Sequence, residues 1–526
     1  MMTDPAAVTL VHELLADSAR RRPDAPALID GPRVTSYREL DRLANQFANL
    51  LAHAGVKRDD RVAIALDNSI ELVIAYFGTM KAGAVAVPLP AGPKSDRLGV
   101  AVADCAPVVA VIDAATARVV DDAHPLAGVP SIFVTGRLRP GQSLAPTHIA
   151  FTDAITDVAD EAPRIPIVDT DLAAIIYTSG STGEPRGVML THGNIVANAR
   201  SIVGYLRLTE HDRVMCVLPF SYVYGLSLLH THLAVGGSVV IDNRFVYPNI
   251  VLRAMNQHAV TGFAGVPSTF ALLLHRSELD STVLPSLRYV TQAGGAMPVT
   301  QIQEWLARGP QVPFYVMYGA TEASARLTFL DPARLPDKIG SIGKAIPDVE
   351  IRVVKEDGSI AGPNEVGELV ASGANIAKGY WNKPDETGER FGPLGYRTGD
   401  LGYADDDGFL FLVGRRHDML KVGANRVGAK EIEDVLHQFA GVHEVAVVPA
   451  PHELLGEVPV AFVAMADGDE IDAKTLEAFC HSRLPPYKVP AYFIFKRELP
   501  KLGAVGKIDK TRLREEARTS PVGAAH

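Results

Sequence analysis

The sequence predicts an α/β protein with a large N-terminal domain of mainly parallel sheets with outer helices, followed by a small α+β C-terminal domain. Three observations support this prediction: helix-type and strand-type patterns alternate in the first third, the sequence pattern changes after Asp400, and the chain is long. Its 526 residues exceed what one hydrophobic core can organise, because single cores stop growing near about 250–300 residues.

The alternation in the first third has the βαβ form that produces parallel sheets. Ser36 and Glu39 have capping-box spacing and precede apolar residues at helical spacing from Leu40 to Leu51, and Gly55 suits the end of that helix. The next elements are predicted as a strand at 62–66, a helix at 70–82 and a strand at 84–87. Such a series predicts neighbouring parallel strands with the helix outside the sheet.

The C-terminal part reads as a separate unit. A turn at Asp405–Gly408 predicts a hairpin between 401–403 and 409–413. We place the domain boundary at Arg416–His417, which divides the chain into residues 1–416 and 417–526. The smaller part is predicted to hold helices at 429–436 and 476–484 and strands at 442–448 and 458–464.

Composition excludes several classes of protein. The net charge of -10 argues against nucleic acid as a main partner, because phosphate-backbone binders need a basic face. No run approaches the ~18 apolar residues of a membrane helix, so no membrane span is expected. The N-terminus has Asp4 and no basic-then-apolar signal pattern, which predicts a cytoplasmic location. Cys105, Cys216 and Cys480 are predicted to be reduced, mostly buried thiols, and no structural metal is implied.

A run of Ser, Thr and Gly residues from Thr178 to Gly183 follows an apolar strand pattern at 172–176. Hydroxyl donors in this run are Thr178, Ser179, Ser181 and Thr182, Gly180 and Gly183 let the backbone approach a ligand, and Arg186 adds positive charge. Such a loop predicts phosphate binding, although a plain turn is the alternative. It lacks the Gly-Lys-Ser/Thr ending of the nucleoside-triphosphate P-loop.

Four more short motifs follow in order along the chain. They are Tyr318-Gly319-Ala320-Thr321-Glu322, Tyr396-Arg397-Thr398-Gly399-Asp400, Gly414-Arg415-Arg416-His417-Asp418 and Gly506-Lys507-Ile508-Asp509-Lys510. With the Ser/Thr/Gly loop, they make the chain resemble the ATP-dependent adenylate-forming enzymes: acyl- and aryl-CoA synthetases, amino-acid adenylation domains and beetle luciferases. The resemblance covers roughly Val11 to Leu513, and five motifs in order are specific where one would not be.

The resemblance implies a reaction in two steps. A carboxylate attacks the α-phosphorus of ATP, giving an acyl-adenylate and pyrophosphate, and a thiol then displaces AMP. It assigns Lys507 to the carboxylate and α-phosphate, Thr321 to the α-phosphate and Glu322 to Mg²⁺. For Glu322 the alternative is an acid at a helix N-terminus, and a lysine near a C-terminus is ordinarily a solvated residue.

The nucleoside half of the site follows from the same resemblance. Tyr318 would stack on adenine with Gly319 allowing close approach, and Gly295 and Ala296 match the other adenine wall. Asp400 would accept both ribose hydroxyls and Arg415 would also reach the ribose. The alternative for Asp400 and Arg415 is a structural ion pair. Val316 stands where many relatives carry asparagine.

Two further departures concern charge and movement. Arg186 replaces the lysine usual in the phosphate loop, which keeps the charge but changes its shape. His417 stands at the hinge about which relatives rotate a mobile small domain, and a solvated surface histidine is the alternative.

The acyl side of the site is expected in Leu218–Leu226, which matches the segment lining the acyl tunnel. Tyr222, Tyr224 and Gly225, together with Gly294, are its predicted residues, with aromatic core packing as the alternative for Tyr222. Val223 stands where amino-acid adenylation domains carry an acid, which disfavours α-amino-acid substrates.

The thiol side is expected around Gly423 and Arg426, in a segment that turns toward the site for thioester formation. Residues Arg483 to Arg518 hold ten Lys or Arg and four Asp or Glu, a net charge of +6, which suits the phosphates of CoA or an acidic carrier protein. The predicted function is therefore ligation of a carboxylic acid, such as a fatty acid, to a thiol, using ATP and Mg²⁺. CoA is the default acceptor and the phosphopantetheine of a stand-alone acyl carrier protein its rival. Luciferase-type oxygenation and a non-catalytic binding protein remain as other classes.

Overall fold

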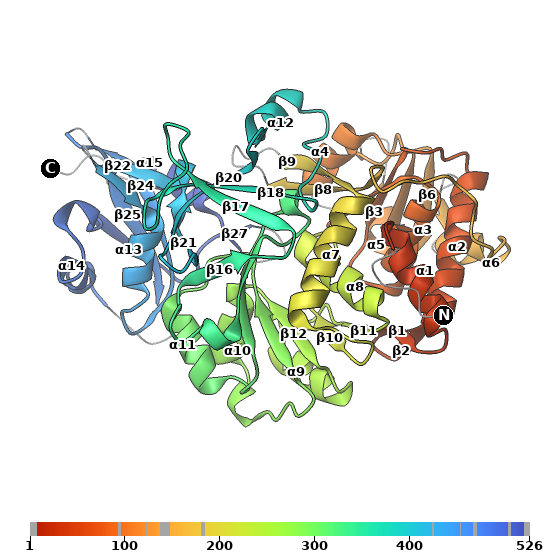
Figure 1. Ribbon diagram of the computed structural model, residues 1–526, viewed down its shortest axis with the longest axis horizontal. Helices are drawn as coiled ribbons and strands as arrows, with labels where there is room; N and C mark the ends of the chain where they lie inside the picture. Colours follow the sequence, from red (N-terminus) through yellow and green to blue (C-terminus); the bar gives the residue numbers. More distant parts are fainter. Residues whose placement is uncertain are drawn as a thin grey trace.

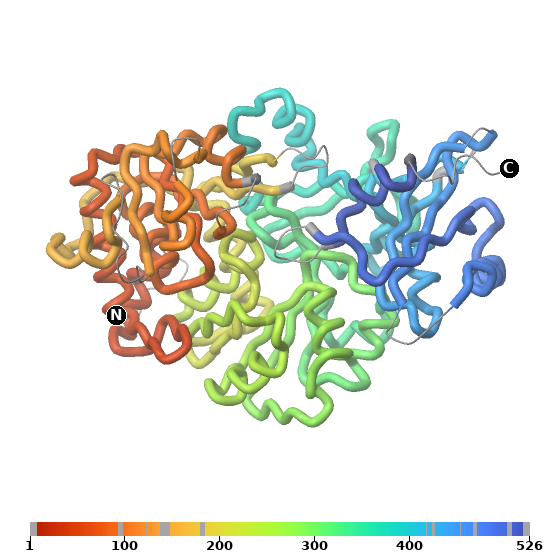
Figure 2. Tube along the Cα trace, turned by 180° about the vertical axis from the view of Figure 1, so that it is seen from behind, coloured from red at the N-terminus to blue at the C-terminus, as the bar shows by residue number. Residues whose placement is uncertain are grey.

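The structure is a computed structural model that describes residues 8–92, 96–120, 124–136, 148–179, 185–422, 425–452, 454–465, 471–502 and 507–519. It is an α/β protein, as predicted. Two large sheets with their helices make up the part drawn from red to cyan in Figure 1, and a smaller blue part lies at one end; Figure 2 shows the same arrangement from behind.

The first sheet contains seven strands in the order β7-β6-β5-β3-β4-β8-β9 among the described residues. All neighbours are parallel except β8 and β9, which are antiparallel. The strands are β3 (Arg61–Ala65), β4 (Val85–Leu89), β5 (Val109–Asp113), β6 (Ser131–Thr135), β7 (His148–Ala150), β8 (Leu172–Ser179) and β9 (Pro185–Thr191). The predicted βαβ unit is therefore confirmed, with α3 (Ile70–Lys81) joining β3 to β4.

The second sheet contains fourteen strands in the described part of the chain, in the order β17-β18-β20-β21-β16-β15-β14-β13-β12-β10-β11-β1-β2, with β19 paired to β20. It is parallel between β1 and β14 and antiparallel from β14 to β17. Its strands are β1 (Pro26–Asp30), β2 (Arg33–Ser36), β10 (Arg213–Cys216), β11 (Ser238–Ile241), β12 (Gly262–Gly265), β13 (Tyr289–Gln292), β14 (Phe314–Tyr318), β15 (Thr328–Leu330), β16 (Ser341–Ala345), β17 (Val349–Val354), β18 (Gly367–Gly373), β19 (Phe391–Gly392), β20 (Gly395–Ala404) and β21 (Leu410–Arg415).

The main hydrophobic core lies between the two sheets, where helices of the N-terminal half pack on strands of both. Ser36 caps α2 by accepting a hydrogen bond from the Glu39 N–H at 3.3 Å, as the capping-box spacing predicts. A second group of helices covers the far face of the larger sheet. The helices are α1 (Val11–Arg21), α2 (Tyr37–His53), α4 (Asp96–Cys105), α5 (Ala114–Ala117), α6 (Phe151–Thr156), α7 (His192–Leu206), α8 (Val223–Val235), α9 (Pro248–Gln257), α10 (Pro267–Arg276), α11 (Val299–Arg308) and α12 (Pro384–Arg390).

As far as the structure describes it, the C-terminal part has a five-stranded sheet of its own, in the order β23-β22-β25-β24 with β26 paired to β25. Its elements are β22 (Met419–Val422), β23 (Asn425–Gly428), α13 (Ala429–Leu436), β24 (Val442–His452), β25 (Gly456–Met465), α14 (Ala473–His481), β26 (Tyr492–Lys496), β27 (Lys501–Leu502), β28 (Lys507–Ile508) and α15 (Lys510–Thr519). A short 3-10 helix, Arg416–Asp418, joins β21 of the larger sheet to β22. The predicted boundary at Arg416–His417 falls in this connection and stays a prediction.

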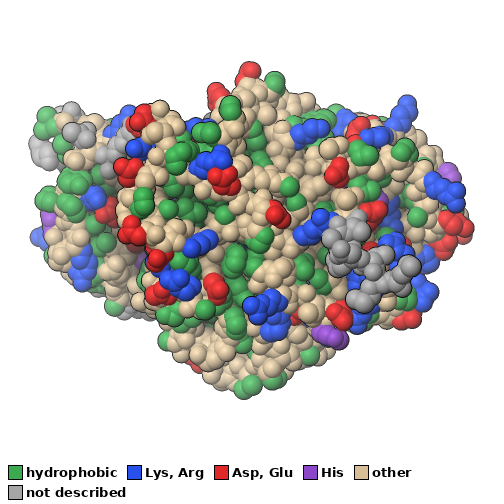
Figure 3. Space-filling model, in the orientation of Figure 1, with side chains coloured by type: hydrophobic (Ala, Val, Ile, Leu, Met, Phe, Trp, Pro, Cys, Tyr) green, Lys and Arg blue, Asp and Glu red, His purple; other side chains and the backbone are tan. Residues whose placement is uncertain are grey.

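The three cysteines are free and buried, as expected. Burial raises the pKa of Cys105 and Cys216 to about 12 and that of Cys480 to about 11, so these thiols are unreactive. Within the described ranges, no helix is long and apolar enough to cross a membrane. On the face drawn in Figure 3, acidic and basic side chains are interspersed, which differs from the basic stripe of a nucleic-acid binder.

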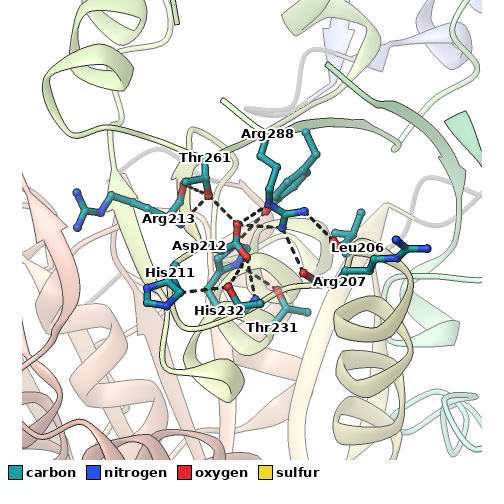
Figure 4. Close-up of polar contacts among 11 residues, drawn as sticks. Leu206, Arg207, His211, Asp212, Arg213, Thr231, His232, Thr261 and Arg288 are labelled. Carbon is teal, nitrogen blue, oxygen red and sulfur yellow. Dashed lines mark hydrogen bonds and ion pairs between the residues drawn. The ribbon is translucent and has the colours of Figure 1, made fainter. Parts of the chain in front are cut away.

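One polar network around the buried Asp212 links the starts of three adjacent parallel strands (Figure 4). Asp212, just before β10, accepts hydrogen bonds from Nε and Nη2 of Arg288 at 3.0 and 2.9 Å and from Oγ1 of Thr261 at 2.9 Å. Thr261 and Arg288 stand just before β12 and β13. The network joins the amino ends of these parallel strands. Their carboxyl ends lie at the opposite edge of the sheet, where Tyr318 ends the neighbouring strand β14.

Candidate active site

The predicted ribose contact, Asp400, forms one cluster with two other predicted residues. The Tyr318 hydroxyl at the end of β14 donates to Oδ2 of Asp400 at 2.6 Å, and Nε of Arg415 lies 3.2 Å from Oδ1. Asp400 and Arg415 are direct cross-strand partners on β20 and β21. Burial and the adjacent Asp400 carboxylate raise the pKa of Tyr318 well above its usual value, so its hydroxyl stays a donor.

The Asp400–Arg415 ion pair considered from the sequence is present in the structure. The Asp400 side chain is 13% exposed and that of Arg415 is 47% exposed, so the pair lies at the edge of the site rather than in the core. A pair of this exposure contributes little to stability. The carboxylate keeps free lone pairs for a diol ligand, because each oxygen can accept two hydrogen bonds.

A second cluster links the predicted metal ligand to the predicted phosphate loop. Glu322 lies in a 3-10 helix (Thr321–Ala323), and its Oε1 accepts a hydrogen bond from the Tyr380 hydroxyl at 2.8 Å. The guanidinium carbon of Arg186 lies 5.6 Å from the centre of the Tyr380 ring, and Nε of Arg186 lies 2.5 Å from Oε2 of Glu386. Tyr380 therefore lies between the carboxylate of Glu322 and the cation beside the loop.

Backbone pairing explains why these two segments lie together. All three bonds join backbone N–H groups to backbone carbonyls. Lys378 donates to Met189 at 3.0 Å, Met189 donates to Gly379 at 2.9 Å, and Trp381 donates to Gly187 at 2.7 Å. The segment before Tyr380 therefore continues the edge of β9, which leads out of the Ser/Thr/Gly loop. The Ala377 N–H also donates to the carbonyl of Glu322 at 2.8 Å, which ties the same segment to the other motif.

The turn after Glu322 is strained and closely packed. Ser324 and Ala325 have φ angles of 56° and 120°, where residues other than glycine are uncommon. A Cβ at Gly319 would lie 1.9 Å from the carbonyl oxygen of Ala325, so only glycine fits at that position. Asn198 and Asn375 hold the turn by donating side-chain hydrogen bonds to the carbonyls of Ala323 and Arg326. Such strain is retained where surrounding structure supports it, often at functional sites.

A small cavity of about 30 Å³ lies between the start of α8 and this turn. Three of the predicted acyl residues line it, Tyr222, Tyr224 and Gly294, and so do Thr321 and Gly319 of the adenylate motif. The complete lining is Tyr222, Val223, Tyr224, Ala293, Gly294, Gly319, Ala320, Thr321, Ala325 and Arg326. The predicted acyl and phosphate groups of residues thus meet in one cavity.

Two predicted glycines differ in their surroundings. A Cβ at Gly294 would lie 2.9 Å from the Tyr222 hydroxyl, so a larger residue at position 294 would press on the Tyr222 side chain. Gly225 is not among the residues that line the cavity, and a Cβ there would lie 2.3 Å from the carbonyl oxygen of Pro219. Gly225 is required by the packing of the loop before α8.

The remaining predicted residues are placed by their backbone. Thr178 on β8 pairs with Arg186 on β9, and Gly295 and Ala296 lie exposed in the turn after β13. Lys507 begins β28 opposite Leu502, Arg426 on β23 pairs with Lys421, and His417 lies in the 3-10 connection, but their side chains lie outside what the structure describes. The Ser179 side chain and Gly180, Ser181, Thr182, Gly183 and Gly423 also lie outside the described residues.

Glu322 fits a Mg²⁺ that takes most of its ligands from a nucleotide. In the described residues, no group of three or more His, Cys, Asp or Glu side chains could hold a metal ion. A single carboxylate, oriented by the Tyr380 hydroxyl, suits Mg²⁺ because this ion keeps waters and phosphate oxygens as its other ligands.

Sequence reasoning missed two residues of the site, Tyr380 and Arg326. Tyr380 belongs to none of the five motifs and reaches Glu322 only because its segment pairs with β9. Arg326 lies four residues after Glu322, and nothing in the local pattern indicates that an arginine there is buried.

A two-sheet fold with these clusters defines an adenylate-forming enzyme. The chain belongs to the AMP-binding enzyme family: that family matches residues 15–381, and the AMP-binding enzyme C-terminal domain matches residues 431–507. The resemblance read from the motifs is therefore confirmed.

The relatives are ligases that act on different acids. The chain is 31% identical to a long-chain-fatty-acid–CoA ligase of Bacillus subtilis (96% of this chain, 94% of the relative) and 34% identical to a feruloyl-CoA synthase of an Amycolatopsis species (94% and 96%). It is also similar to the solved structure of O-succinylbenzoate coenzyme A synthetase from Bacillus subtilis in complex with ATP and a magnesium ion, with a TM-score of 0.81, 28% identity and coverage of 95% and 98%. The predicted enzyme class, an AMP-forming acid–thiol ligase, is borne out by these relatives.

Proposed function

We propose that this protein activates a carboxylic acid with ATP and Mg²⁺ as an acyl-adenylate and then transfers the acyl group to the thiol of CoA. One observation carries the proposal: the residues predicted to bind the nucleotide and those predicted to bind the acid meet at one turn. Tyr318 contacts Asp400 on one side of this turn, and Thr321 lines the cavity with Tyr222 and Tyr224 on the other.

The nucleotide would lie along the turn between β14 and the 3-10 helix. Asp400 and Arg415 would hold the ribose, the ring of Tyr318 would face adenine opposite Gly295 and Ala296, and Thr321 would donate to the α-phosphate. Mg²⁺ held by Glu322 would neutralise charge on the triphosphate. The Ser/Thr/Gly loop with Arg186 would hold the outer phosphates.

The acid would enter beside Tyr222, Tyr224 and Gly294. Lys507 would bring its ammonium to the reacting carboxylate and α-phosphate, and its position on the C-terminal part lets domain movement deliver or withdraw that charge. His417 would lie at the hinge, and Gly423 and Arg426 would face the thiol after rotation.

Arg186 is proposed to differ in action from a lysine. Its guanidinium pairs with Glu386 and lies against Tyr380, so it is held beside the loop before any nucleotide arrives. A planar, preorganised donor loses less entropy on binding phosphate than a flexible ammonium does.

CoA is favoured over a carrier protein as the acceptor because the relatives named above are CoA ligases or synthases. The basic segment from Arg483 to Arg518 suits the phosphates of CoA as well as it suits an acidic carrier protein. Transfer to a stand-alone carrier protein is retained as an arm of the test.

Carboxylate-dependent ATP–pyrophosphate exchange over a panel of fatty, aryl and dicarboxylic acids tests the proposal. Exchange with one class of acid, followed by thioester formation with CoA, is the expected result. A thioester formed only on a holo-carrier protein would replace the acceptor. Absence of exchange with every acid, in folded protein that binds ATP, would overturn the proposal.

A further inference from the structure

The cavity beside Thr321 is lined by a buried arginine that has no carboxylate partner among the described residues. Arg326 is 2% exposed and is among the largest fully buried side chains of the described chain. No carboxylate in the described residues forms an ion pair or hydrogen bond with its guanidinium, and its Nε has no hydrogen-bond partner. Arginines this deeply buried are ordinarily paired, because an unpaired charge in the interior is strongly destabilising.

The guanidinium is surrounded by tyrosines instead of acids. Its central carbon lies 4.7 Å from the centre of the Tyr224 ring. Its charge also acts on Tyr205 and Tyr222. Burial raises the pKa of Tyr205, Tyr222 and Tyr224, and the charge of Arg326 opposes that rise at each of them. These neutral rings stabilise a cation only in part.

The fold holds this charge in place at a cost. The carbonyl of Arg326 accepts hydrogen bonds from Nδ2 of Asn198 at 3.0 Å and of Asn375 at 2.8 Å, and the strained Ser324–Ala325 pair precedes it. Backbone strain, two amide anchors and an uncompensated cation in one turn are features of a binding site rather than of a core optimised for stability.

We propose that Arg326 binds a second carboxylate on the acyl substrate, so that the enzyme acts on a short dicarboxylic acid. This inference rests on the proposed function, because it names the acid class that the same site activates. One carboxylate would be activated beside Thr321, and the other would accept hydrogen bonds from the Arg326 guanidinium at the far side of the cavity. A carboxylate matches the planar, bidentate donors of arginine in both charge and shape.

The cavity brings Thr321 and Arg326 close together. Both residues line the same cavity of about 30 Å³, and Tyr222 and Gly294 line it as well. A carboxylate activated beside Thr321 therefore lies near Arg326, so that the second carboxylate of a short acid would reach the guanidinium.

The first measurement is the specificity constant kcat/KM in ATP–pyrophosphate exchange for malonate, succinate, glutarate and adipate. Each acid is compared with its own monoamide and with the monocarboxylic acid of equal length. We expect the best dicarboxylate to exceed its monoamide by about 30-fold or more, the fold-change that corresponds to about 2 kcal/mol lost when one partner of a buried charge pair is removed.

Two variants separate binding of the second carboxylate from structural support. Arg326→Met should remove the advantage of the dicarboxylate over its monoamide, so that the ratio of their two kcat/KM values falls to about one. Arg308→Met is the matched control, because Arg308 on α11 is exposed and pairs with Asp280 and Glu304. It should keep the preference for the dicarboxylate.

A second measurement does not depend on catalysis. In the absence of ATP, the best dicarboxylate should raise the Tm of the wild-type protein and of Arg308→Met but leave the Tm of Arg326→Met unchanged. The unliganded Arg326→Met protein should be at least as stable as wild type, because it loses an uncompensated buried charge.

The outcomes distinguish this inference from the proposed function. Exchange that is best with monocarboxylic acids, or lowered equally for all acids by Arg326→Met, would overturn the inference and leave the ligase function standing. If no acid supports exchange, the ligase proposal fails. The thermal measurement still decides about Arg326, because a dicarboxylate that raises the Tm of neither protein excludes the site.

Discussion

The hydroxyl of Tyr318 provides the sharpest test of the ribose site, because it can be removed without removing the ring. In Tyr318→Phe the ring that would face adenine stays, and only the 2.6 Å hydrogen bond to Asp400 is lost. Asp400 then keeps its ion pair with Arg415, whose Nε lies 3.2 Å from Oδ1 of Asp400.

The expected loss follows from the kind of bond. A hydrogen bond to a charged group contributes about 1.5–3 kcal/mol, which corresponds to about 10- to 140-fold in a rate or binding constant. We expect kcat/KM for ATP in the exchange assay to fall within that range. The fall should appear mainly as a higher KM, because the ribose contact is made in the ground state and the transition state alike.

A double-mutant cycle with Asp400→Asn shows whether the hydroxyl acts through Asp400. In the Asp400→Asn background, Tyr318→Phe should cost less than about threefold, because its acceptor has already lost its charge. Tyr37→Phe is the matched control: Tyr37 is a buried tyrosine whose hydroxyl donates to the carbonyl of Gly237 at 2.7 Å, and neither residue belongs to a motif. A Tyr318→Phe enzyme with unchanged KM for ATP, or with a loss fully additive to that of Asp400→Asn, would refute the assignment.

Three further predictions concern other parts of the molecule. Lys507→Ala should abolish acyl-adenylate formation and leave thiol capture of a pre-made adenylate largely intact, and equal loss of both half-reactions would make Lys507 structural. Tyr380→Phe should raise the Mg²⁺ concentration for half-maximal exchange about 10- to 100-fold, since it removes the donor that orients Glu322, and an unchanged Mg²⁺ dependence would exclude that role. Asp212→Asn should lower the free energy of unfolding, measured in urea titrations, by about 3 kcal/mol. This value is the lower end of the range for breaking a buried ion pair, because Arg288 is partly exposed. Burial raises the pKa of Asp212, but hydrogen bonds from the Thr209 N–H, Arg288 and Thr261 outweigh it and leave the pKa below its usual value. The stability that Asp212 contributes is therefore present above its unfolded pKa of about 3.9 and lost as pH falls through the lower folded value. The difference between wild type and Asp212→Asn should shrink over that acidic range, and a difference that does not change with pH would contradict this.

Local sequence patterns were enough to predict the elements and the motif clusters formed by neighbouring strands. Asp400 and Arg415 meet because the predicted hairpin aligns them as cross-strand partners. The helix start at Ser36 and the α3 helix followed from capping and periodicity, which act over a few residues.

Contacts between distant segments were not predictable in the same way. Tyr380 reaches Glu322 through backbone pairing with β9, almost two hundred residues earlier in the chain, and no local rule specifies that pairing. Arg326 has the local pattern of an exposed charge, but the positive φ angles of Ser324 and Ala325 turn it into the cavity. Gly225 also packs closely against the Pro219 backbone, which its motif did not indicate, and its expected acyl contact stays a prediction.

The most direct test of the central claim follows one oxygen atom through the reaction. The acid that supports exchange is labelled with ¹⁸O in its carboxylate and incubated with ATP, Mg²⁺ and CoA, and the nucleotide product is analysed by mass spectrometry. Attack of the carboxylate on the α-phosphorus places a labelled oxygen between acyl group and phosphate, and the thiol then releases it with the nucleotide. The account predicts AMP that carries one labelled oxygen and unlabelled pyrophosphate. Label in inorganic phosphate together with ADP, or unlabelled AMP, would contradict it.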